Sequence, residues 1–136
     1  MSVITELIRQ EQDGTISFGN YEAASKQKLA DFEVDGDLYY IKTCSEITRV
    51  EKNGSLLLES LPGCTVHHFS NDGRTVTFSL ETYRDTTVTL ELESDKEYRI
   101  FMDDEEVDKV KANLAGKVTF STEAIKQSIQ IRIEKI

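Results

Sequence analysis

The sequence predicts an all-β protein, an antiparallel β-sandwich of two packed sheets, from three observations. Apolar and polar residues alternate in segments such as 75–81, 87–93 and 129–134. Successive side chains of a strand point to opposite faces, so each segment has one core face and one solvent face. Turn-forming pairs containing Gly separate these segments at short intervals. Finally, 136 residues suit one domain, 1–136, and all-β chains of this size usually form two packed sheets.

The turn pairs also predict how the strands are connected. Asp13-Gly14, Asp35-Gly36, Asn53-Gly54 and Asn71-Asp72-Gly73 favour the positive φ of tight hairpin turns. The predicted hairpins join 32–34 to 38–43, 46–51 to 55–59, and 64–69 to 75–81. Pro62-Gly63 fits the central positions of a type II turn.

The C-terminal third continues the pattern, with strands expected at 98–102, 117–120 and 128–135. Residues 103–112 are ambiguous, because Asp103 or Asp104 could cap a helical turn. We favour a hairpin tip followed by a strand. At the other end of the chain, the spacing of Ile4, Leu7 and Ile8 leaves a short helix or helical turn open.

The net charge of −9 is concentrated in one part of the chain. Residues 81–108 contain eleven of the 25 acids and three of the 16 bases. This acidic balance argues against binding to nucleic acid or to an anionic membrane, since both require a basic face. The acidic stretch is either a solvated surface that resists aggregation, a docking face for a basic partner, or a cation site. The candidate docking residues are Glu91, Glu93, Asp103, Asp104, Glu105 and Glu106.

The chain begins without the basic and apolar regions of a secretory signal, and it has no apolar run near the length of a membrane helix. We therefore expect a cytoplasmic protein. Cys44 and Cys64 are then reduced thiols, buried in strands. No Cys-x-x-Cys or Cys/His pattern is present, so neither a structural zinc nor another metal or cofactor is expected.

Five stretches resemble small bacterial proteins that carry the automatic label "endosialidase": 16–21, 36–39, 47–54, 59–63 and 89–93. The resemblance spans nearly the whole chain, in order. True endosialidases are similar to long phage tailspikes with a β-propeller catalytic domain, which 136 residues cannot contain. The resemblance therefore implies a family but no site residue.

A second resemblance covers residues 98–103, 116–120 and 129–131, which look like the small C-terminal β-sandwich modules of glycoside hydrolases. Those modules usually have Asp-Gly at the hairpin tip. Here Asp103-Asp104-Glu105-Glu106 stands instead, which predicts a longer or differently formed turn. This resemblance implies a fold and not a function.

Candidate catalytic groups are few. On a regular strand Cys64, Val66 and His68 would share one face, and Thr65, His67 and Phe69 the other. Cys64 and His68 would then lie roughly 13 Å apart, too far for a nucleophile and its base. No P-loop, GxGxxG, GxSxG or HExxH motif is present.

Carbohydrate binding is an alternative, although the chain has no Trp to stack on sugar rings. Its tyrosines could serve instead, but Tyr39 and Tyr40 are neighbours on a strand, so at most one of them can join a given surface. The leading hypothesis is a non-enzymatic interaction or assembly module that binds a protein partner or self-associates. The alternatives are a carbohydrate-binding accessory module and, after it, a small glycan-processing hydrolase.

Overall fold

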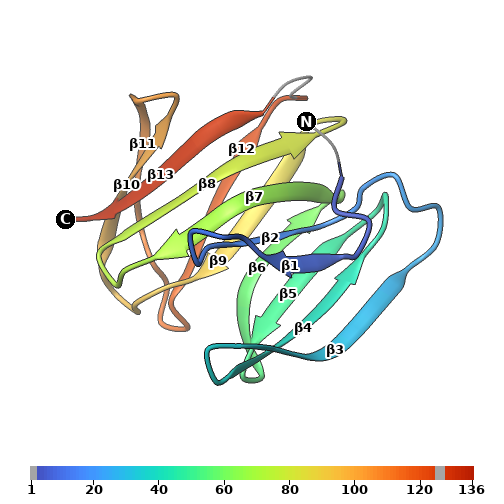
Figure 1. Cartoon of the computed structure of the whole chain (residues 1–136). Coiled ribbons are helices and arrows are strands. Elements are labelled where there is room, and N and C mark those ends of the chain that lie inside the picture. The colour runs from blue at the N-terminus through green and yellow to red at the C-terminus, as the bar shows by residue number, and fades with distance from the viewer. Residues whose placement is uncertain (1–2, 125–127) are drawn as a thin grey trace.

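Thirteen strands form two sheets in the computed structural model, which describes residues 3–124 and 128–136 (Figure 1). Sheet A contains β1 (Ile8–Gln10), β2 (Ile16–Phe18), β7 (Cys64–Asn71), β8 (Thr75–Thr82), β10 (Glu97–Met102), β11 (Glu105–Lys111) and β13 (Ile129–Lys135). Sheet B contains β3 (Gln27–Val34), β4 (Asp37–Thr43), β5 (Thr48–Lys52), β6 (Ser55–Leu61), β9 (Thr86–Glu91) and β12 (Lys117–Thr122).

The strands run antiparallel in both sheets, in the order β1-β2-β7-β8-β13-β10-β11 in sheet A and β12-β9-β6-β5-β4-β3 in sheet B. No helix occurs in residues 3–124 or 128–136, so none there could cross a membrane. The predicted antiparallel β-sandwich is confirmed.

The core lies between the two sheets and is filled by the alternate apolar residues that predicted the strands. Phe78 and Ile131 of sheet A are fully buried, and so are Leu58 and Leu90 of sheet B. Their polar neighbours along each strand face away from the core, as the period of two requires. Burial of these side chains supplies the main driving force for closing the sandwich.

All three predicted hairpins are present. The β3–β4, β5–β6 and β7–β8 pairs have the expected partners. At the first two turns both central residues have positive φ, for example 52° at Asp35 and 88° at Gly36. This is the geometry of the type I′ turn, whose twist matches that of the flanking strands.

The tip of the β10–β11 hairpin differs from its prediction. Met102 pairs with Glu105, so Asp103 and Asp104 form a two-residue turn, with φ of 49° and 67°. Asp tolerates the left-handed region better than most residues, and this turn therefore forms without Gly. The expected longer or differently formed tip is wrong, whereas the preferred reading of a strand after it is confirmed by β11.

At the N-terminus the sequence left a short helix or a helical turn open, and the structure has a single turn: Ile4 and Leu7 hydrogen-bond to Gly19 instead of continuing as a helix. The expectation for Pro62-Gly63 is wrong. The Leu61–Pro62 peptide is cis and Gly63 lacks a positive φ, so this pair is not a type II turn. Gly63 is needed for space, since an added Cβ would lie 2.1 Å from the carbonyl oxygen of Cys44.

Candidate functional site

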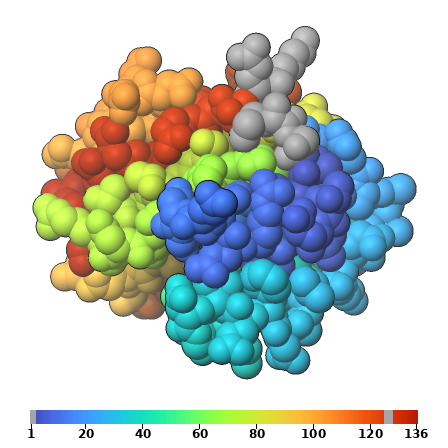
Figure 2. All heavy atoms as spheres, in the orientation of Figure 1, coloured from blue at the N-terminus to red at the C-terminus, as the bar shows by residue number. Residues whose placement is uncertain are grey.

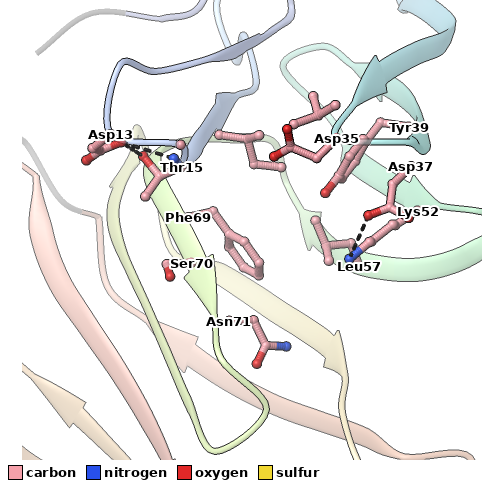
Figure 3. A pocket seen from close by; sticks show the side chains of 13 residues that line it. Asp13, Thr15, Asp35, Asp37, Tyr39, Lys52, Leu57, Phe69, Ser70 and Asn71 are labelled. Atoms are coloured by element: carbon pink, nitrogen blue, oxygen red, sulfur yellow. Dashed lines mark hydrogen bonds and ion pairs between the residues drawn. The ribbon is translucent and has the colours of Figure 1, made fainter.

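A cavity of about 410 Å³ opens at one end of the sandwich, and we call it the end hollow (Figure 3). Its volume lies within the range of small-ligand pockets. In Figure 2 the blue β1–β2 hairpin lies directly beside the teal β3–β4 hairpin, and these two hairpins supply much of the lining. The lining residues are Asp13, Gly14, Thr15, Ile16, Val34, Asp35, Asp37, Tyr39, Lys52, Leu57, Phe69, Ser70 and Asn71.

The floor of the end hollow is apolar and belongs to the core. Ile16 and Phe69 are paired neighbours in sheet A, and Val34 lies at the end of β3 in sheet B. All three are buried. The Phe69 ring also stacks on Phe78, with 5.6 Å between ring centroids. The floor is therefore held in place by packing and needs no ligand to form.

A bulge in β7 places Phe69 in this floor. The register with β8 shifts between His67 and Ser70, and His68 has a φ of 56°. The extra residue breaks the alternation, so Phe69 follows Val66 into the core while His68 is exposed. The predicted faces of His68 and Phe69 are therefore wrong, because the prediction assumed a regular strand.

A second bulge brings Leu57 into the cavity lining. Val50 pairs with Leu58 and Glu51 pairs with Leu56, which leaves Leu57 as the extra residue of β6. Leu57 is half-buried and lines the end hollow from sheet B. Both bulges thus shape the same cavity, in keeping with the frequent position of bulges at functional surfaces.

One side of the rim is built by the β1–β2 turn. Asp13 Oδ1 accepts hydrogen bonds from the Thr15 hydroxyl at 2.6 Å and from the Thr15 backbone N–H at 3.0 Å. These bonds, the hydroxyl first, lower the pKa of Asp13. His68 Nδ1 lies 3.0 Å from the Thr15 hydroxyl and 3.3 Å from Asp13 Oδ2. His68, exposed by the β7 bulge, therefore contacts both Thr15 and Asp13 and helps to hold the β1–β2 turn in place.

The opposite side of the rim carries carboxylates from the β3–β4 hairpin. Asp37 Oδ1 accepts a hydrogen bond from Asn53 Nδ2 at 2.9 Å, and Lys52 Nζ lies 3.5 Å from Asp37 Oδ2. The Asn53 hydrogen bond is the main cause of the lowered pKa of Asp37. Asp35 has a weaker contact, 3.5 Å from Gln10 Nε2. Its carboxylate is thus the least engaged of the three on the rim.

Tyr39 adds a hydroxyl close to the apolar floor. Its side chain is 8% exposed, and among residues 3–124 and 128–136 its hydroxyl has no hydrogen-bond partner. Burial raises the pKa of Tyr39, so the hydroxyl keeps its proton at neutral pH and can both donate and accept. Figure 3 shows this ring reaching from sheet B toward the side of Phe69. Tyr40 does not line the end hollow, but it lines a separate hollow together with Tyr39, so the prediction that at most one of the two joins a given surface is wrong there.

The six acids predicted as a docking face fall into two groups. Glu91 ends β9, and Glu93 follows it near the start of β10, where its backbone N–H donates to the Tyr98 hydroxyl at 3.0 Å. The other four acids, at 103–106, surround the turn at the far end of β10. Six residues of strand separate the groups by roughly 17 Å.

Bases from β13 balance part of this acidic stretch. Lys135 pairs with Glu93, and Arg132 pairs with Asp104 at 2.6 Å. Arg132 also lies 4.1 Å from the centroid of the Phe101 ring. These bases lie outside residues 81–108. The net negative charge counted for that stretch is therefore larger than the negative charge of the surface on which it folds.

The other candidate groups do not form a reactive site together. Cys44 and Cys64 are free and buried, as predicted, but only Cys64 lies in a strand, because β4 ends one residue before Cys44. Desolvation raises the pKa of Cys64 to about 12, so its thiol is not ionised at neutral pH. His68 instead contacts Thr15 and Asp13 at the rim. In the described residues no group of His, Cys, Asp and Glu side chains is arranged to hold a metal ion.

Comparisons of the chain with protein-family models, curated proteins and solved structures find no match. The sequence marks Asp13, Asp35 and Asn71 as turn residues and Tyr39 as a possible binding residue, but it does not show that they lie close together. Their convergence depends on how the two sheets pack, and no local signal in the sequence reports that.

Proposed function

We propose that this protein is a non-catalytic binding module whose end hollow takes a neutral saccharide. The observation that supports this most is the combination of an apolar floor with a rim of hydrogen-bonding groups. Saccharides present apolar C–H surfaces together with hydroxyls that both donate and accept. The Tyr39 hydroxyl, the Asp35 carboxylate and the Asn71 amide offer matching groups around Phe69.

The charge of the rim favours a neutral ligand. Three carboxylates line the hollow, and Lys52 is the one base among the lining residues. The lowered pKa values of Asp13 and Asp37 keep both ionised at neutral pH. An acidic sugar would meet net repulsion there. The proposed ligand class therefore excludes sialic acids, although the proposed family resemblance carries the label "endosialidase".

A glycan array containing neutral and sialylated glycans tests the proposal. We expect responses to a set of neutral glycans and weaker responses to their sialylated forms. Tyr39→Phe should weaken binding about tenfold, because it removes a hydroxyl next to the ligand and retains the ring. Tyr40→Phe, on the opposite face of β4, is the matched control and should bind as the wild type does. A flat response to every neutral glycan would overturn the proposal.

Protein docking through the acidic stretch is the second candidate. The feature that favours it is the β10–β11 tip, where Asp104 is 86% exposed even though it pairs with Arg132. Exposed charges of one sign can steer a basic partner. The absence of enzyme activity and the cytoplasmic location stay predictions. They are tested by activity assays on the glycans that bind and by cell fractionation.

A further inference from the structure

A second cavity of about 260 Å³ lies beside the end hollow, and we call it the side hollow. Its lining comes from the β7–β8 turn, the start of β8, the end of β9 and β10. Asn71 lines both cavities. The two cavities therefore meet at the end of β7, on the same end of the sandwich.

The side hollow repeats the chemistry of the end hollow. Val76 and Tyr98 are buried residues that form an apolar base beneath the polar groups. The Tyr98 hydroxyl accepts the Glu93 N–H at 3.0 Å and keeps its own proton for a further bond. Asn71 Oδ1 accepts the Gly73 N–H at 2.9 Å, which leaves the amide NH2 of Asn71 as a donor between the two cavities.

Two charged side chains of the side hollow have no ion-pair partner among residues 3–124 and 128–136. These are Arg74, in the β7–β8 turn, and Glu91, at the end of β9. Glu93, by contrast, is already paired with Lys135. Arg74 can donate several hydrogen bonds and Glu91 can accept several, so together they match the hydroxyl groups of a sugar ring.

We infer that the two hollows form one groove that takes an extended neutral oligosaccharide, with neighbouring sugar units in each hollow and Asn71 between them. This inference rests on the proposed function of the end hollow. It assigns the side hollow as a second subsite, in which Arg74 and Glu91 contact the ligand. It also gives Glu91 a role in ligand binding that is separate from protein docking.

Calorimetric titration with two ladders of probes tests the inference: N-acetylglucosamine with its dimer and tetramer, and glucose with cellobiose and cellotetraose. In a ladder that binds, we expect affinity to rise at least tenfold from monomer to tetramer. Arg74→Ala and Glu91→Ala should each reduce tetramer affinity toward that of the monomer and leave monomer affinity unchanged. Arg99→Ala, at an exposed position on the outer face of β10, is the matched control and should change neither.

The possible failures can be told apart. Equal affinity for monomer and tetramer would overturn the second subsite and leave the proposed function in place. An equal loss of monomer and tetramer affinity in Arg74→Ala would also overturn it, since the two hollows would then not act separately. If no neutral probe binds here or on the array, the proposed function fails and this inference fails with it.

Discussion

The rim of the end hollow and the acidic stretch at 81–108 are both rich in carboxylates, yet the fold uses them differently. On the rim, Asp13, Asp35 and Asp37 surround an apolar floor supplied by both sheets. In the acidic stretch, Asp104 lies in the exposed β10–β11 turn and Glu106 lies on exposed β11, and both pair with bases of the same sheet. Acid density is therefore a poor guide to a binding site, and concave apolar surroundings are a better one.

The largest expected difference between the two regions is in stability. Phe69→Ala should lower the free energy of unfolding by about 3–5 kcal/mol, because it removes a buried ring that packs on Phe78. Phe101→Ala, next to Arg132, should cost only about 1 kcal/mol, since that ring is half-exposed. Urea unfolding of both variants measures the difference. Similar losses would show that the floor of the hollow is not part of the core.

The next effect is on binding. Asp35→Asn should weaken binding of the best neutral glycan about tenfold, because a neutral amide replaces a charged acceptor. Asp104→Asn makes the same chemical change at the β10–β11 tip and should leave the affinity unchanged. Calorimetric titration compares the two variants with the wild type. A comparable loss in Asp104→Asn would mean that the ligand lies elsewhere.

The pKa values of the rim carboxylates test their hydrogen bonds, because Asp13 and Asp37 have different partners. Asp13 and Asp37 should titrate below their ordinary value of 3.8 in the folded protein, as measured by NMR of the carboxyl carbons. A lowered pKa in the folded state stabilises the protein above the ordinary value, and this contribution is lost as the pH falls through the lowered pKa. Thr15→Val should raise the pKa of Asp13 and leave that of Asp37 in place. An unchanged pKa of Asp13 in Thr15→Val would contradict the hydrogen bonds between Asp13 and Thr15.

The smallest effect is expected at the β10–β11 tip. Reversing Asp104 and Glu105 to Lys should change the free energy of unfolding by less than about 1 kcal/mol, because exposed ion pairs contribute little. Saccharide affinity should not change, which calorimetry on the same variant checks. The variant also tests docking. If the variant no longer captures a basic partner that the wild type retains, the acidic stretch is a docking surface. If capture is unchanged, the charge of the stretch serves solubility alone.

Much of the fold could be predicted from local sequence. The pairs Asp35-Gly36 and Asn53-Gly54 mark type I′ turns, because few other residues accept positive φ at both positions. The local rules failed, or left alternatives open, where a long-range contact decided the structure. Gly63 is required by the nearby Cys44 carbonyl, and Ile4 turns back because it bonds to Gly19.

The candidate site was less predictable. The sequence offers Tyr39 as one possible sugar contact, but the strand period places Phe69 on the wrong face, because the bulge at His68 leaves no mark in the hydrophobic pattern. From sequence, Asp13 and Asp35 are turn formers only. The sequence does not show that these two turns meet across the sandwich.

Most of the strands, most of their turns and the net charge follow from local sequence, because these depend on residues close together in the chain. Which turns meet at one end of the sandwich, and which acids face bases, depends on the packing and order of the strands. The tertiary structure also decides where bulges direct Phe69 and Leu57. Those features depend on sheet order and register, which are set by contacts between residues far apart in sequence. The concentrated negative charge can be read from the sequence. The end hollow cannot, because residues of both sheets line it.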